Sequence, residues 1–94
     1  MKRIFEEVAL EIDRGRHEHR EFSSAHEAYA VLLEEVDELW DTVRMPDYVC
    51  QRVGPALARD RMPNKERYER MRREALQVAA CALRLIKEVC DPRL

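Results

Sequence analysis

The sequence predicts an all-α protein of three main antiparallel helices that assemble into an oligomeric helical bundle. Gly and Pro together number only six among the 94 residues, and aromatic residues make up 6% of the chain. Leu, Ala, Glu and Arg dominate the composition, and these residues favour helices over strands. Apolar residues also recur at helical spacing over three long segments. These observations together favour the all-α class.

The length predicts a single domain that spans residues 1–94. A chain this short buries only about 60–65% of its unfolded surface, so association with a second copy would enlarge a small core. The net charge of −2 gives no general attraction to nucleic acid or to a membrane. No apolar run approaches the roughly 18 residues of a membrane span. Three cysteines without C-x-x-C spacing indicate reduced thiols in a cytoplasmic protein.

The first two helices have recognisable starts and stops. A first helix is expected over residues 2–14 or slightly beyond, where apolar residues repeat at helical spacing: Ile4, Phe5, Val8 and Ile12. Ser24 followed by Glu27 fits a capping box, in which each side chain satisfies a free backbone N–H. The second helix therefore begins after Ser24 and runs to about Arg44, because Pro46 cannot continue it.

The rest of the chain predicts a long connection and a third helix. Residues 45–63 contain three prolines and a glycine, so a connection with at most a short helix over residues 56–61 is expected. Asn64 can cap a third helix over residues 65–90, which stops before Pro92. Its second half, "ALQVAACALRLI", is apolar nearly all round. Such a segment is usually buried between several helices or in a subunit interface.

The second helix combines an apolar stripe with an acidic flank. The predicted core stripe consists of Ala28, Tyr29, Leu32, Val36, Leu39, Trp40 and Val43. Glu34, Glu35 and Glu38 form a contiguous group beside it, with almost no basic residue within one turn. Glu34 and Glu38 are four residues apart, a like-charge spacing that costs roughly 0.2–0.5 kcal/mol. A solvated acidic face is one interpretation, and a site for an external cation is the other.

A metal site would need ligands from a facing helix as well. The third helix offers Glu74 and Gln77, three residues apart on one edge. Carboxylate and amide oxygens suit Mg²⁺ or Mn²⁺. Two helices that present such ligands from edges flanking the core would form a metal site within a bundle.

The E-E-x-x-E stretch of Glu34, Glu35 and Glu38, followed by the later pair, resembles the MazG-type all-α nucleoside triphosphate pyrophosphohydrolases. That superfamily is similar to the all-α dUTPases and the phosphoribosyl-ATP pyrophosphohydrolases. The segment "HEAYAVLLEEVDELWDTV" resembles small stand-alone members especially closely. The resemblance implies Mg²⁺-dependent hydrolysis of a nucleotide to its monophosphate and pyrophosphate, with Mn²⁺ as a substitute, in a homodimer or homotetramer.

The resemblance also implies roles for individual residues. It makes Glu35, Glu38 and Glu74 metal ligands, with Glu35 part of the catalytic pair. Glu34 becomes a further ligand or the base that activates water. Gln77 stands where the family pattern has Asp, so one ligand is expected to be neutral or absent. The gap between Glu38 and Glu74 is longer than in compact members.

Basic residues are expected to meet the outer phosphates of the nucleotide. The candidates are Lys65, Arg67, Arg70 and Arg73, with pairing on the helix surface as the alternative role. His26 is a candidate for contact with the base, with a capping role as its alternative. A phosphoribosyl-ATP pyrophosphohydrolase or dUTPase-like enzyme remains an alternative activity. A non-catalytic helical interaction module with an acidic face is the alternative from another class.

Overall fold

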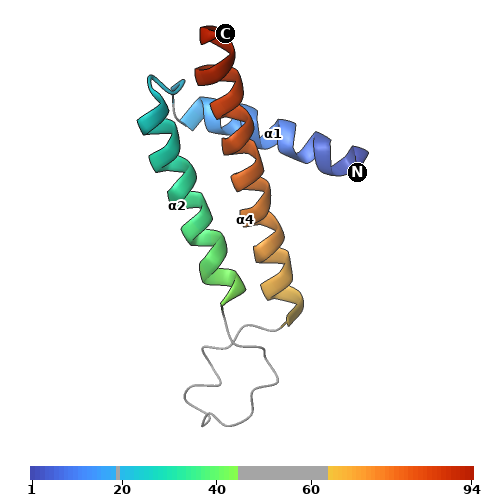
Figure 1. Ribbon diagram of the computed structural model, residues 1–94. Helices are drawn as coiled ribbons and strands as arrows, with labels where there is room; N and C mark the ends of the chain where they lie inside the picture. Colours follow the sequence, from blue (N-terminus) through green and yellow to red (C-terminus); the bar gives the residue numbers. More distant parts are fainter. Residues whose placement is uncertain (19, 45–63) are drawn as a thin grey trace.

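The computed structural model describes residues 1–18, 20–44 and 64–94 (Figure 1), and within them the chain is helical with no strand. The all-α prediction is therefore confirmed. No helix in this part of the chain is long and apolar enough to cross a membrane. The elements are α1 (Lys2–Glu18), α2 (Ala25–Val43), α4 (Asn64–Leu85), a π-helical turn η1 (Ile86–Cys90) and a 3₁₀ turn η2 (Asp91–Arg93). The expected connection over residues 45–63 lies outside the described residues.

Helices α2 and α4 lie side by side, and α1 crosses α4 rather than running alongside it (Figure 1). At one end of the pair, Arg67 of α4 donates to the backbone oxygens of Thr42 (3.2 Å) and Val43 (2.8 Å). These bonds satisfy carbonyls that have no partner within α2. Near the crossing, the Arg72 guanidinium donates to the Glu7 carboxylate and joins α4 to α1.

The start of α2 confirms half of the predicted capping box. The Glu27 N–H donates to Ser24 Oγ at 3.1 Å, as expected of an N-cap serine. The Glu27 carboxylate does not accept a hydrogen bond from the Ser24 N–H. It accepts instead from Ser23 Oγ at 3.0 Å and from the Ser23 N–H at 3.4 Å. At the other end, Arg44 is the C-cap residue, which agrees with the predicted boundary.

Helix α1 extends to Glu18, one turn beyond the expected end. It passes over α4 at Gly15, where an added Cβ would lie 3.3 Å from Arg84 Nη1. Gly15 therefore lies directly beside the end of the Arg84 side chain, which would have to shift by a few tenths of an ångström to admit a Cβ.

The helical path at the C-terminus runs further than predicted. Helix α4 begins at Asn64 itself, and after Leu85 the chain continues through the π-helical and 3₁₀ turns to Arg93. Pro92 lies within the first positions of the 3₁₀ turn. A proline is tolerated there because a first-turn N–H has no partner to lose.

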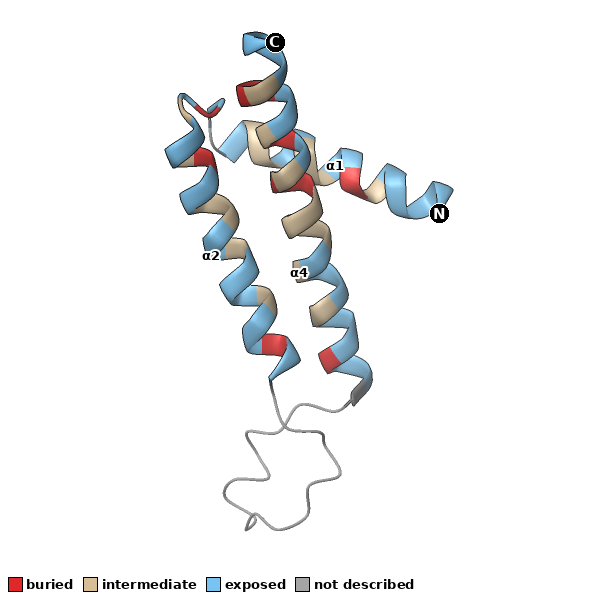
Figure 2. Ribbon diagram, in the orientation of Figure 1, coloured by how far each residue is buried: buried red, intermediate tan, exposed pale blue. Residues whose placement is uncertain are grey.

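The core of the single chain is small, as Figure 2 shows by the scarcity of red segments. In the described part of the chain, the buried apolar residues are Val8, Phe22, Ala28, Ala80, Cys81 and Val89. The predicted core stripe of α2 is only partly confirmed, since Ala28 is buried and Leu32 and Leu39 are half-buried. Four members of the stripe are exposed in the chain: Tyr29, Val36, Trp40 and Val43. The interpretation of Trp40 as a core residue is therefore wrong for the single chain, where 57% of its surface is exposed.

Candidate metal and substrate site

Three carboxylates predicted as metal ligands converge from two helices. Glu35 and Glu38 are supplied by α2 and Glu74 by α4, and one oxygen of each lies within 4.8 Å of the others. The helical spacing of the two α2 residues places both on one edge, and the pairing of α2 with α4 brings Glu74 to that edge. Glu35 and Glu74 are half-buried, whereas Glu38 is exposed.

The electrostatics of this cluster favour an added positive charge. Burial raises the pKa of Glu35, and the negative charges of Glu38 and Glu74 raise it further. Burial likewise raises the pKa of Glu74. The negative charge of Glu38 and the hydrogen bond between the Glu38 and Glu74 side chains raise the pKa of Glu74 further. Arg70 and Arg73 act in the opposite direction on the pKa of Glu74 but do not prevail. A divalent cation would remove this repulsion, and hard oxygen ligands are the type that Mg²⁺ prefers.

Gln77 links the cluster to α1. With its amide nitrogen turned to the carboxylates, it donates to Glu35 Oε2 and to Glu74 Oε2, both at 3.1 Å. Its amide oxygen then accepts from Arg14 Nη2 at 3.1 Å. The opposite orientation would set the amide oxygen against two carboxylate oxygens, so the network selects the first one. In this arrangement Gln77 holds two carboxylates in place, and its oxygen faces Arg14 and not the cluster.

Gln77 is expected to support the activity of the cluster although it is neutral. Replacing Gln77 with alanine should lower metal affinity or activity by roughly 10–100-fold, as the loss of a group that orients ligands does. Gln77→Asp loses the two hydrogen bonds that the amide donates to Glu35 and Glu74 but adds a carboxylate to the same edge, so we expect it to keep Mg²⁺ binding. Titration of Mg²⁺ against enzyme activity measures both effects. Unchanged Mg²⁺ dependence in Gln77→Ala would contradict the role given to this residue.

A cleft of about 630 Å³ opens beside the cluster, between α1, α2 and α4. Its volume lies in the range typical of small-molecule sites. Glu35 belongs to both the cluster and the cleft wall, and Gln77 and Glu34 line the cleft without belonging to the cluster. The other residues of the wall come from α1, from the segment between α1 and α2, from α2 and from α4: Glu11, Arg14, Gly15, Glu18, Arg20, Phe22, Glu27, Val31, Ala80, Cys81 and Arg84.

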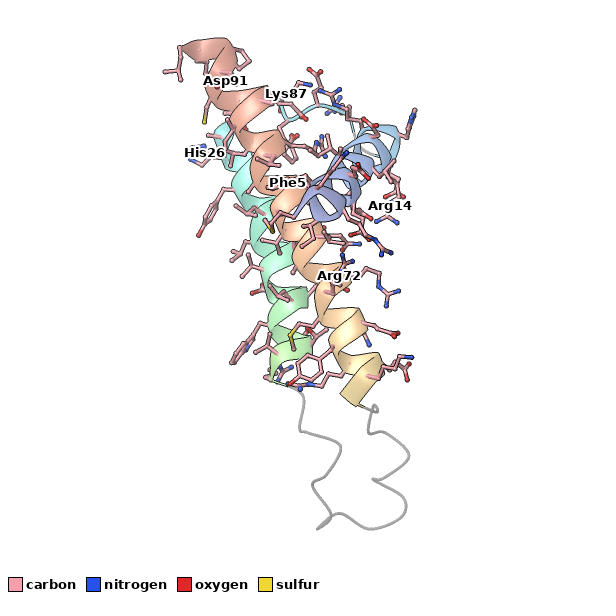
Figure 3. All side chains as sticks on the ribbon, turned by 90° about the vertical axis from the view of Figure 1, so that its right-hand side faces the viewer. Phe5, Arg14, His26, Arg72, Lys87 and Asp91 are labelled. Atoms are coloured by element: carbon pink, nitrogen blue, oxygen red, sulfur yellow. The ribbon has the colours of Figure 1, made fainter. Side chains whose placement is uncertain are left out.

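The predicted phosphate and base contacts lie outside this cleft wall. His26 is exposed in the first turn of α2, and Figure 3 places it away from Arg14 across the molecule. Lys65 is exposed and lies 4.0 Å from Glu69. Arg70 and Arg73 are exposed and close enough to Glu74 to affect its pKa. Their roles toward a substrate stay predictions.

Sequence reasoning missed the buried ion pair that forms one end of the cleft. Glu88 accepts from Arg84 Nε at 2.8 Å, from Arg84 Nη2 at 3.1 Å and from the Phe22 N–H at 2.9 Å. The Arg84 guanidinium also lies over the Phe22 ring, 4.3 Å from its centre, and donates to the Arg20 backbone oxygen. The signal for this pair was an i,i+4 pair of opposite charges inside an apolar run.

Cys81 lines the cleft but fits a packing role. It is buried, and burial together with the charge of Glu35 raises the pKa of its thiol. The thiol is therefore protonated and is neither a nucleophile nor a ligand in this state. It packs in the core beside Phe22 and Ala28.

No protein-family model, curated protein or solved structure matches this chain. The resemblance of the acidic motif to the MazG-type enzymes therefore stays a prediction. What supports a function is the geometry of the carboxylates and of the cleft beside them.

Proposed function

We propose that this chain is a Mg²⁺-dependent nucleoside triphosphate pyrophosphohydrolase, which converts a (d)NTP and water to the (d)NMP and pyrophosphate. The observation that carries the proposal is the convergence of Glu35, Glu38 and Glu74 beside a cleft large enough for a nucleotide. Mn²⁺ would serve as a substitute, because it accepts the same oxygen ligands.

The carboxylates of the cluster and of the cleft wall would have different roles in this reaction. Glu35, Glu38 and Glu74 would hold the cation, which supplies charge neutralisation at the phosphates. Glu34 lines the cleft outside the cluster and is suited to take the proton of the attacking water. The water oxygen forms a bond to the α-phosphorus, the bond between the α-phosphorus and its bridging oxygen breaks, and pyrophosphate leaves.

Positive charge for the outer phosphates is available near the cluster. Arg70 and Arg73 lie within electrostatic range of Glu74, and Lys65 lies in the first turn of the same helix. Arg14 lines the cleft itself and bonds to Gln77. We assign the phosphates to this basic set and leave His26 as the candidate for contact with the base.

The proposed enzyme is a cytoplasmic homodimer or homotetramer, in which α2 and α4 pair antiparallel within an oligomeric helical bundle. Its support is the small core of the single chain, whose buried apolar residues in the described segments include no Leu, Ile or Met. A core of this size contributes little stability to a chain of 94 residues.

Incubation with a panel of ribo- and deoxyribonucleoside triphosphates and Mg²⁺ should release pyrophosphate from at least one of them. The reason is that the carboxylate cluster suits attack at the α-phosphorus, with pyrophosphate as the leaving group. Separate assays for pyrophosphate and for inorganic phosphate read the outcome. Inorganic phosphate without pyrophosphate would place the attack at the γ-phosphorus and contradict the mechanism. No release of either product would favour the interaction-module alternative.

A further inference from the structure

A chain of hydrogen bonds joins α1 to the carboxylate cluster. Glu11 Oε2 accepts from Arg14 Nη2 at 2.8 Å, and the two residues lie about one turn apart on α1. The same nitrogen donates to the amide oxygen of Gln77 on α4 at 3.1 Å. The amide nitrogen of Gln77 then donates to Glu35 Oε2 and to Glu74 Oε2, also at 3.1 Å. A guanidinium on α1 is therefore connected, through one amide, to two of the three converging carboxylates.

The orientation of the Gln77 amide decides whether this chain of bonds exists. The amide oxygen accepts and the amide nitrogen donates, and rotation of the terminal torsion exchanges the two with little change in shape. In the metal-free protein, both the carboxylates and Arg14 favour the nitrogen toward the cluster. A cation at the cluster would weaken the preference set by the carboxylates, because it neutralises them and attracts amide oxygen. A guanidinium accepts no hydrogen bond, so Arg14 still favours the oxygen on its own side.

Arg14 is suited to this role because its own helix orients it. Its Nη2 lies 2.8 Å from the Glu11 carboxylate, and the two side chains are 54% and 23% exposed. An ion pair with one partner this exposed contributes little to stability. The pair does fix the direction of the guanidinium, which is planar and rigid. Both residues line the cleft beside the cluster, so the direction that is fixed leads toward the proposed site.

We propose that Arg14 is a positioning residue of the cation site, which acts by holding the oxygen of the Gln77 amide away from the carboxylates. The amide nitrogen then keeps Glu35 and Glu74 in the geometry that binds a divalent cation. Both bonds of Arg14 use Nη2, so the rest of the guanidinium is left for the phosphates assigned to it above. The inference rests on the cation site of the proposed function and not on hydrolysis. By thermodynamic linkage, a bound cation strengthens the contact between Arg14 and Gln77 by the same factor.

Titration with Mn²⁺ in the absence of nucleotide measures the affinity of the cluster without an assay of activity. The electron paramagnetic resonance signal of the free ion gives the bound fraction. Arg14→Met should weaken the affinity by about 3–10-fold, the contribution of one hydrogen bond. Loss of a positive charge near the cluster would by itself tighten cation binding, so the two explanations predict opposite signs. Equal or tighter binding of Mn²⁺ by Arg14→Met overturns the inference and leaves the proposed function standing.

Two further variants separate the positioning of the amide from the attachment of α1. Arg72→Met is the matched control, since Arg72 also joins α4 to α1, through Glu7, and the substitution removes the same charge. It should leave the Mn²⁺ affinity unchanged or slightly higher. Arg14→Lys keeps a charge and N–H donors, so it should recover most of the affinity lost in Arg14→Met. If Arg72→Met weakens binding as much as Arg14→Met does, the effect belongs to the attachment of α1 and the inference is wrong.

The double variant Arg14→Met/Gln77→Ala shows whether Arg14 acts through the amide. Arg14→Met should cause no further loss of Mn²⁺ affinity when residue 77 is already alanine, because residues of one hydrogen-bond network do not act additively. The same loss in both backgrounds would mean that Arg14 acts on the cluster by another route, which contradicts the inference.

Side-chain amide signals in an NMR spectrum give a test that needs no cation. The sequence contains three side-chain amides, those of Gln51, Asn64 and Gln77, so the Gln77 signals are identified by their loss in Gln77→Ala. The Gln77 amide protons should exchange slowly with solvent in the wild type and several-fold faster in Arg14→Met. Unchanged exchange rates would overturn the inference alone. A wild type that binds no Mn²⁺ at millimolar concentration contradicts the proposed function and this inference together.

Discussion

Replacing Glu38 with glutamine should remove most of the hydrolysis while the metal-free protein stays as stable as before or becomes slightly more stable. Glu38 is exposed, and its charge raises the pKa of both Glu35 and Glu74. Neutralising it relieves this repulsion and that with Glu34, by a few tenths of a kcal/mol per pair. The same change removes one of three converging ligands and part of the charge that would hold the cation.

Melting curves with and without Mg²⁺ and a pyrophosphate assay measure these effects on the same samples. Mg²⁺ should raise the melting temperature of the wild type, because a ligand of the folded state stabilises it by mass action. The increase should be smaller for Glu38→Gln. Asp37→Asn is the matched control, since Asp37 is the neighbouring exposed acid and lies outside the cluster. It should keep both the activity and the full response to Mg²⁺.

The stability of the metal-free protein should also depend on pH because of the repulsion within the cluster. The folded-state pKa values of Glu35 and Glu74 lie above the ordinary value of 4.5. The stability that their protonated forms provide is therefore fully present below the ordinary pKa and is lost as pH rises through the raised pKa values. Glu38→Gln should weaken this loss, because it removes a charge that causes both shifts.

Two outcomes would contradict this interpretation of the acidic flank. A loss of more than about 1 kcal/mol of metal-free stability in Glu38→Gln would make the residue structural, as a lost hydrogen bond would. Full activity in the variant would instead make the acidic flank a solvated surface. In both cases the cluster would no longer support the proposed function.

The carboxylate cluster could be predicted because its geometry is mostly local. Glu35 and Glu38 share an edge of α2 by spacing alone, and the apolar stripe beside them fixes which edge meets the next helix. Glu74 and Gln77 share an edge of α4 for the same reason. The start of α2 was also predictable, since Ser24 acts through residues three positions away.

The other features of the fold depend on contacts between distant residues, which the spacing of residues along one helix does not predict. A helical wheel finds Trp40 on an apolar face, but it does not say whether that face meets the same chain or another one. Gly15 of α1 lies beside Arg84 of α4, 69 positions apart in the numbering, and no local pattern links the two residues. The i,i+4 spacing of Arg84 and Glu88 is common on exposed helix surfaces, so the burial of the pair could be identified only from the fold.

Replacing Arg84 with methionine should destabilise the protein by about 3–5 kcal/mol, the range observed when one partner of a buried ion pair is removed. The side chain of Glu88 is 2% exposed and that of Arg84 6%. Without the guanidinium, Glu88 would keep the Phe22 N–H and lose both charged hydrogen bonds. Arg84 also holds the Arg20 backbone oxygen, so the segment between α1 and α2 should loosen as well.

The double variant Arg84→Met/Glu88→Leu separates the buried charge from the lost packing. It removes the buried carboxylate that has lost Arg84 as its partner, and apolar replacements of buried ion pairs are often neutral or stabilising. It should therefore recover most of the stability lost by the single variant. Lys87→Met is the control for methionine at a neighbouring exposed position, and it should change the free energy of unfolding by less than about 0.5 kcal/mol.

Urea unfolding over a pH series at fixed protein concentration gives a second, independent test. Burial acts to raise the pKa of Glu88, but the hydrogen bonds from Arg84 and from the Phe22 N–H prevail and lower it below the ordinary 4.5. The stability that Glu88 provides in the wild type is thus present above the ordinary pKa and is lost as pH falls through the lowered one. Arg84→Met loses the lowering contributions of Arg84 while the burial remains, so the pKa of Glu88 should rise relative to the wild type and the loss of stability at low pH should be weaker. Two results together would contradict this role of the Arg84–Glu88 pair: parallel pH profiles of the free energy of unfolding in the wild type and in Arg84→Met, and a loss of less than about 1 kcal/mol of that free energy in the variant. The pair would then not hold the segment between α1 and α2 against the end of α4.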